Sequence, residues 1–310
     1  MNQKVICIYH HVDFDGICSA KIVQEAYPNQ EVVTVPWNYG DLNPTSMLQS
    51  AITKEEVCPL IIMVDVCLPI EDVKTLLSHV GYENFIWIDH HTTSIHKMND
   101  ERINLRGLQV IGGEAACVLA YKYFNKTVDD SGMAKFPLIP MGVQLIGCLD
   151  VWDKTGKYFD WDTQINPFYL GLESKCKGIT KFPSIRELCS VEFVEEMIGR
   201  GKVIEDYFNR KNNFYSSKAF HVEIDGLRIL ALNTAQRGSS ILYPIFNYDL
   251  HDGVMMFSYD GCNRIWTYSL YTTKPGIDVS TIASKRGGGG HPGASGFFTN
   301  NLISELKFII

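Results

Sequence analysis

Acidic and imidazole side chains follow an apolar stretch of this 310-residue chain, and they are the groups best suited to carry chemistry. The stretch at residues 85–88 has the length and composition of a buried strand, and it leads directly into Asp89, His90 and His91. In an open α/β sheet, ligands bind beyond the carboxyl ends of the strands. Carboxylate oxygens bind hard divalent metals, and imidazole nitrogens widen the choice towards manganese or zinc.

The same pattern occurs twice more. Asp13 and Asp15 come after the apolar stretch at residues 5–9, and Asp65 directly follows the one at residues 60–64. Because Asp13 and Asp15 are two residues apart, an extended backbone points both carboxylates the same way. Each acid alone is more often a helix N-cap, and a histidine pair in a loop is usually solvated. Three such strand ends together predict one shared cation site, since caps need no imidazole and no Asp-x-Asp spacing.

The elements that must position these groups alternate between short apolar runs and amphipathic stretches. This alternation predicts an α/β fold with a parallel, doubly wound sheet. A buried helix predicted at 138–149 brings Asp150 to its C-terminal end, where an acid opposes the helix dipole unless a cation is nearby. Gly112 and Gly113 open another helix and fit either an anion cradle or a plain turn. The predicted strands are 4–9, 31–36, 60–64 and 85–88, and the helices between them are 16–27, 44–53 and 69–79.

The last third of the chain has a different pattern. After a long amphipathic stretch come hairpin signals and then four glycines, 287–290, between Arg286 and His291. Such glycines let the backbone approach a ligand and offer its N–H groups to an anion. A flexible hinge is the alternative, but a hinge does not require a flanking arginine and histidine. We predict a first domain at 1–190, a helical linker at 191–217 and a smaller α+β domain at 218–310.

The composition limits the kinds of partner and the cellular setting that we expect for this protein. The net charge of −7 disfavours tight binding to long nucleic acid, which depends on neutralising many phosphates. The nine cysteines form no Cys-x-x-Cys pair, which favours reduced thiols in a cytoplasmic protein. No apolar run approaches eighteen residues, so we expect no membrane span. The oligomeric state, a homodimer included, stays open at this point.

With these residues in view, the chain resembles the DHH phosphoesterases that carry a C-terminal DHH-associated domain. The resemblance rests on Asp-x-Asp-Gly at 13–16, Asp65, Asp-His-His at 89–91, Asp150, and Gly-Gly-Gly-His-x-x-Ala-x-Gly at 288–296. His-x-Asp-x-Asp-Gly, Trp-Ile-Asp-His-His-x-Thr and Asp-x-Trp are most similar to the branch described as oligoribonuclease or cyclic-nucleotide phosphodiesterase.

The resemblance implies two divalent metal ions, usually Mn²⁺, and a role for each site residue. Asp65 would bridge the metals, His91 would contact the scissile phosphate, and Asp89 would orient the imidazoles. One metal would be bound by His11 and Asp13, and the other by Asp15, His90 and Asp150. The rest of the substrate would be held from across the cleft by Gly288, Gly289, Gly290 and His291, with Arg286 beside them.

The sequence departs from the family in two places. Many relatives place the first histidine four residues before the first aspartate, where this chain has Tyr9, so Tyr9, His10 and His11 all stay open for that metal. Many relatives also carry Ser-Leu-Arg-Ser where this chain has Ser-Leu-Tyr-Thr at 269–272, so an expected phosphate-binding arginine is missing.

The function predicted is metal-dependent hydrolysis of short oligonucleotides or small, including cyclic, nucleotides by an activated water. Asp65 suits the bridge because it is a lone acid at a central strand end, and the imidazole of His91 can donate to a phosphoryl oxygen. The alternatives are pyrophosphate or polyphosphate hydrolysis, and a non-catalytic nucleotide-binding module.

Overall fold

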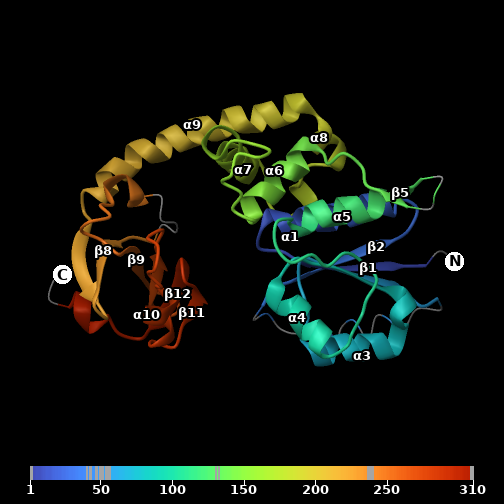
Figure 1. Ribbon diagram of the computed structural model, residues 1–310, viewed down its shortest axis with the longest axis horizontal. Helices are drawn as coiled ribbons and strands as arrows, with labels where there is room; N and C mark the ends of the chain where they lie inside the picture. Colours follow the sequence, from blue (N-terminus) through green and yellow to red (C-terminus); the bar gives the residue numbers. More distant parts are fainter. Residues whose placement is uncertain are drawn as a thin grey trace. The chain divides into compact units, whose positions relative to one another are not determined.

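The protein is described here by a computed structural model, in which the chain divides into two compact units (Figure 1). The units are residues 1–205 and 206–310, and the division falls inside the long helix α9 (Val191–Ser216). The residues that the structure describes are 3–39, 41, 44, 45, 48, 52, 57–129, 131, 133–235 and 241–307.

The first unit contains the parallel sheet that the sequence predicts. Its strands are β1 (Val5–His10), β2 (Val32–Trp37), β3 (Leu60–Val64) and β4 (Phe85–Ile88), in the order β2-β1-β3-β4. All neighbours are parallel, so their carboxyl ends lie at one edge of the sheet. The segment around residues 106–109 adds isolated parallel bridges to the outer side of β4.

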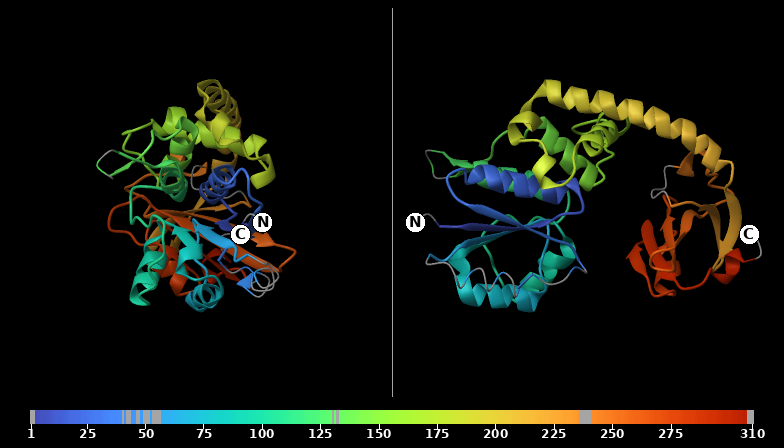
Figure 2. Two further views of the ribbon diagram at one scale, coloured as in Figure 1. Left: turned by 90° about the vertical axis from the view of Figure 1, so that its right-hand side faces the viewer. Right: turned by 180° about the vertical axis from the view of Figure 1, so that it is seen from behind.

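Helices cover both faces of this sheet, as a doubly wound fold requires (Figures 1 and 2). Helices α1 (Phe14–Ala26), α5 (Ala116–Asn125) and α6 (Met141–Asp150) pack on one face, and α3 (Ile70–Val80) and α4 (Thr92–Asp100) on the other. Alternate residues of β1 face the two layers, with odd-numbered ones towards α1 and even-numbered ones towards α3. Burying one aliphatic side chain completely adds about 1.5–3 kcal/mol to the free energy of unfolding. Burial on both faces of the sheet is therefore the main contribution to the stability of this unit.

Several helices were not predicted. α4 begins after His91 without a side-chain cap, α7 (Asn166–Lys175) follows a π-helical turn, and α8 (Ile185–Cys189) is only five residues long. The helix predicted at 44–53 lies largely outside the described residues. None of the helices in the described part of the chain combines the length and the apolar character needed to cross a membrane.

In its described residues, the second unit contains the end of α9, a six-stranded sheet and the short helix α10 (Ser280–Ser284). Asp225 and Gly226 close its first hairpin with left-handed backbones, as an Asp-Gly turn requires. The glycine run is neither a hinge nor an open loop, because Gly289–His291 forms strand β11 against β12. The strands, in the order β11-β12-β10-β9-β8-β7, are β7 (Phe220–Ile224), β8 (Leu227–Asn233), β9 (Gly253–Asp260), β10 (Ile265–Tyr271), β11 (Gly289–His291) and β12 (Ala294–Thr299).

A carboxylate joins two loops of this second unit and makes its stability depend on pH. Asp252 accepts hydrogen bonds from the backbone N–H and guanidinium of Arg228 and from Nζ of Lys274. The side chains of Arg228 and Lys274 therefore hold the pKa of Asp252 well below its usual range.

We expect Asp252→Asn to lower the thermal midpoint by about 5 °C at pH 7, roughly the shift typical of one such contact in a domain of this size. Because the pKa is depressed on folding, the contribution is complete above the unfolded value of about 3.9 and is lost as pH falls below it. Thermal unfolding followed by circular dichroism should therefore show the two proteins converging between about pH 4 and pH 2. A constant difference across that range would contradict this assignment.

Candidate metal centre

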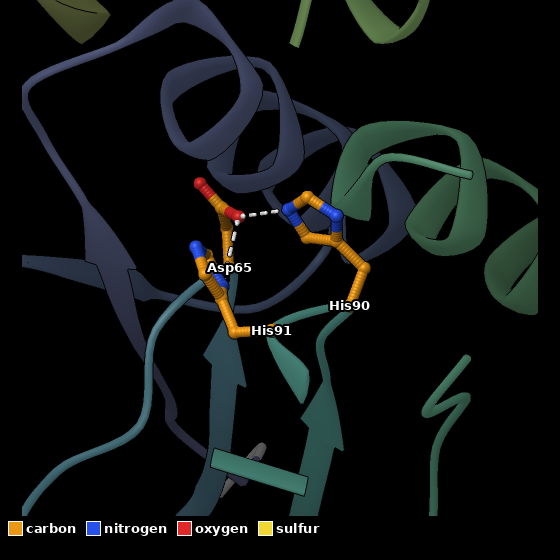
Figure 3. A group of neighbouring side chains, drawn as sticks. All are labelled: Asp65, His90 and His91. Atoms are coloured by element: carbon orange, nitrogen blue, oxygen red, sulfur yellow. Dashed lines mark ion pairs between the residues drawn. The ribbon is translucent and has the colours of Figure 1, made fainter. Parts of the chain in front are cut away.

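The three predicted strand ends meet at one edge of the first unit's sheet. β1 ends at His10, β3 is followed by Asp65, and β4 is followed by Asp89 and the two histidines. Figure 3 shows the Asp65 carboxylate at the tip of β3, with both imidazoles turned towards it from the loop after β4. Their ring nitrogens lie 3.4 Å (His90) and 3.9 Å (His91) from Oδ1 of Asp65.

Asp65 is the residue that the whole cluster shares. It is 1% exposed, and its backbone has φ 58°, a left-handed conformation that a non-glycine residue rarely adopts. Strain of this kind persists where the surrounding structure fixes it, and it is common at functional sites. The turn directs the carboxylate out of the strand end and into the cluster, where Oδ2 lies 3.5 Å from Nδ1 of His10.

The first candidate ligand group consists of His10, Asp13 and Asp65. Asp13 has two roles, because its Oδ1 accepts from the N–H of Gly16 as the N-cap of α1 while its Oδ2 lies 2.7 Å from Nδ1 of His10. The helix-cap interpretation and the metal interpretation are therefore compatible. Gly16 has to be glycine, since a Cβ there would collide with the carbonyl oxygen of His10.

Of the three residues left open for this metal, the structure places His10 in the group, whereas the resemblance implied His11. His10 is the last residue of β1, and its side chain is almost fully buried among the acids. The next residue points elsewhere, because His11 is exposed and places Nε2 3.1 Å from Asp41. Tyr9 packs in the hydrophobic core under α1.

The second candidate group consists of Asp15, His90 and Asp150. Nε2 of His90 lies 3.6 Å from Asp15, 3.4 Å from Asp65 and 3.3 Å from Asp150. Asp15 is buried in α1, and Asp150 is the last residue of α6, as the sequence predicts. His90 therefore connects the second group to Asp65 and so to the first.

The N-terminus of α5 binds Asp15. The N–H groups of Ala116 and Cys117 donate to its two oxygens at 2.8 and 2.7 Å. A helix N-terminus stabilises negative charge, so this contact fixes a buried carboxylate beside the cluster. The glycine pair before the helix has φ 76° at Gly112 and 86° at Gly113, and it forms the turn that leads into it.

Asp89 orients the histidine pair. Its Oδ1 accepts from the backbone N–H of His90 at 2.7 Å, the N–H of His91 at 3.2 Å and Nδ1 of His91 at 2.7 Å. With Nδ1 donating to Asp89, Nε2 of His91 is directed away from it. This contact also raises the pKa of His91 to about 9.

The electrostatics of the cluster favour a bound cation. Burial raises the pKa of Asp65 to about 7, and burial together with the charge of Asp15 does the same for Asp150. The pKa of Asp15 also lies well above its ordinary value, through burial and the charge of Asp65. Burial disfavours the charged form of His10, but hydrogen bonds to Asp13 and Asp65 outweigh it and raise its pKa to about 10. A divalent metal bound among these carboxylates would stabilise their charged forms against both burial and mutual repulsion.

Three atoms at the centre fit metal ligands for a second reason. Oδ1 of Asp65, Nε2 of His90 and Oδ2 of Asp150 are buried side-chain atoms without a hydrogen-bond partner. Buried polar atoms are normally paired, and metal ligation is one explanation for an exception. Carboxylate oxygens with an imidazole nitrogen suit Mn²⁺, Zn²⁺ or a similar ion. The residues present therefore fit a divalent metal centre.

Two residues beside the cluster have no counterpart in the sequence prediction. Oδ1 of Asn38 lies 3.1 Å from Nε2 of His10, and the Tyr39 ring meets the His91 ring edge-on with the centroids 6.5 Å apart. Both follow β2, so the strand-end rule that found the other residues would have indicated them. They were missed because neither is an acid or an imidazole.

The structure places the remaining predicted site residues in the second unit. Arg286 forms ion pairs with Asp225 and Glu305, and its assignment to substrate binding stays a prediction. A Cβ would collide with neighbouring backbone at Gly288 and Gly290, whereas Gly289 faces open space. His291 is exposed at the end of β11.

Comparison with known proteins gives the family. The model of the DHH family, N-terminal domain, matches residues 5–143, and no curated protein matches the chain. An exopolyphosphatase-related protein from Bacteroides fragilis is 14% identical, with 98% of this chain and 88% of that chain covered and a TM-score of 0.50. The pGpG-specific phosphodiesterase PggH from Vibrio is 11% identical, with coverage of 96% and 93% and a TM-score of 0.49. The exonuclease RecJ bound to manganese is 13% identical, with coverage of 95% and 85% and a TM-score of 0.46.

The family match includes most of the cluster. It begins at the first residue of β1, ends three residues into α6, and contains all the ligand candidates except Asp150. The Bacteroides structure, at this level of identity, supports the fold. Residues 5–143 of this chain therefore belong to the DHH family as its N-terminal domain.

Proposed function

We propose that this chain is a metal-dependent phosphoesterase that hydrolyses short oligonucleotides or small nucleotides. The observation that carries the proposal is the overlap of three possible ligand groups, which are the two described above and a third formed by Asp65, His90 and His91. They overlap through Asp65 and His90, at the sheet edge where α/β proteins bind ligands. The DHH family match to the same residues supports it. A non-catalytic nucleotide-binding module has no need for so complete a ligand set.

The residues suit two divalent metals, for which we propose Mn²⁺. His10 and Asp13 would hold one, Asp15, His90 and Asp150 the other, and Asp65 would contribute to both. Such metals supply Lewis-acid stabilisation of phosphoryl oxygens and a nucleophilic water at neutral pH.

His91 has a different role from His90 in this proposal. Its Nδ1 donates to Asp89, and its raised pKa keeps the imidazole protonated near neutral pH. Nε2 is then a positioned donor for a phosphoryl oxygen, where negative charge increases during hydrolysis. Asp89 acts as a positioning residue, because it fixes both the ring and the loop that carries it.

The substrate proposed is short. The net charge of −7 disfavours a long polyanion, which binds by neutralising many phosphates. A few local groups and two metals are enough for a dinucleotide or a cyclic nucleotide. The exposed backbone at Gly289 and the imidazole of His291 remain the candidates in the second unit for contact with such a substrate.

The proposal is tested by a substrate panel with the full chain. Chelation should abolish hydrolysis of di- to pentanucleotides or cyclic nucleotides, and Mn²⁺ should restore it. Chromatography of the products distinguishes release of mononucleotide from release of phosphate. Pyrophosphate and polyphosphate serve as the comparison, and a preference for either of them over every nucleotide would replace the proposed function with an inorganic phosphohydrolase.

The two histidines should separate metal binding from transition-state stabilisation. His90→Ala should reduce metal content, because Nε2 of His90 lies within 3.6 Å of three carboxylates. His91→Ala should retain the metal and lower kcat by about 10²–10³, the loss typical of one oxyanion-type donor. Elemental analysis and steady-state kinetics of both variants decide the matter. Equal metal loss in the two would show that His91 is also a ligand.

A further inference from the structure

Two tryptophans lie together just after the last ligand candidate of the first unit. Trp152 follows Asp150 by two residues, and its ring stacks on Trp161 with the centroids 5.3 Å apart and the planes 17° from parallel. Trp161 is half-buried, whereas Trp152 is 68% exposed. One face of Trp152 is therefore supported by protein, and the other is open to solvent.

A lysine lies beside this stack without covering its open face. Nζ of Lys154 is 5.2 Å from the ring centroid of Trp152 and 4.8 Å from that of Trp161. With 5.3 Å between the rings, the three points form a nearly equilateral triangle, so the ammonium lies at the side. A cation over the outer face of Trp152 would be roughly 9 Å from Trp161. The stack thus combines an open π-face with an adjacent positive charge.

The backbone keeps the indole in this position at a cost. Trp152 has φ 52°, a left-handed conformation that is uncommon for a bulky residue. The turn is fixed by hydrogen bonds from the N–H of Asp153 to the carbonyl of Cys148 and from the N–H of Trp152 to that of Leu149. Trp161 begins a π-helical turn, an element that is frequent at functional sites. Burial does not offset the strain, because the ring is exposed.

We propose that the outer face of Trp152 binds a nucleobase of the substrate whose phosphate is held at the metal centre, an inference that rests on the proposed function. Two residues of chain span at most about 7 Å, so the indole starts close to Asp150. Stacking tolerates any base, because every base has a π-face. Trp152 would then favour substrates that carry a base over inorganic phosphates, without distinguishing one base from another. Lys154 would favour an anionic nucleotide at this position.

The test compares a dinucleotide with its abasic analogue, which has the same phosphates and sugars. Trp152→Ala should raise KM for the dinucleotide about 5- to 150-fold, the range that corresponds to one stacked base. It should leave kcat/KM for the abasic analogue unchanged, and Trp152→Phe should restore most of the dinucleotide affinity. Tyr82→Ala is the matched control, since Tyr82 is 50% exposed but precedes β4 at the opposite edge of the sheet. Equal effects on the two substrates, or no effect on either, would overturn the stacking role.

A binding measurement separates this inference from the proposed function. Titration with adenosine monophosphate should quench tryptophan fluorescence in the wild type, and Trp152→Phe should lose that quenching. If no phosphoester in the panel is hydrolysed yet this difference is seen, the proposed function fails and the base site stands. If dinucleotides are hydrolysed but the quenching is the same in both proteins, the function stands and the stacking role is excluded.

Discussion

The structure of the first unit depends on a group of carboxylates held close together at the sheet edge, two of which have an oxygen atom without a hydrogen-bond partner. Asp15 and Asp65 are almost fully buried at the sheet edge, with Asp13 and Asp150 beside them. Burying unpaired charge is costly, and like charges so close together raise one another's pKa values. Asp13 is paired with His10 and Asp15 with the start of α5, but Oδ1 of Asp65 and Oδ2 of Asp150 have no hydrogen-bond partner. The arrangement is physically reasonable if a divalent cation completes it.

The surrounding fold serves to hold these groups in place. Parallel strands bring three chain segments to the same edge, and the left-handed turn at Asp65 aims its carboxylate into the centre. Two N–H groups at the start of α5 donate to Asp15 and hold it in place. Three N–H groups of the histidine loop donate to Asp89, which holds that loop in place. These contacts come from elements that are far apart in sequence, so the geometry of the centre depends on the packing of both faces of the sheet.

The sheet and most residues of the candidate metal centre could be predicted from the sequence, because a hydrophobic run followed by an acid indicates where a strand ends. β3 and β4 have the predicted bounds, and the acids after the strands do converge. The choice between His10 and His11 could not be made, because it depends on which way one side chain leaves the end of β1. The ion pairs of Arg286 could not be predicted either, because its partners Asp225 and Glu305 lie far from it in sequence.

The central claim is that Asp65 contributes to both halves of one metal centre, and metal content tests it most directly. Asn tolerates a left-handed backbone, so Asp65→Asn preserves the turn while it removes the charge. After dialysis against Mn²⁺ and removal of free ion, elemental analysis should find two ions per chain in the wild type and in the exposed control His11→Ala. Asp65→Asn should lose both. Its metal-free form should be at least as stable to heat as the metal-free wild type, because a source of repulsion is gone. Two retained ions in Asp65→Asn, or a marked loss of stability without metal, would contradict the account.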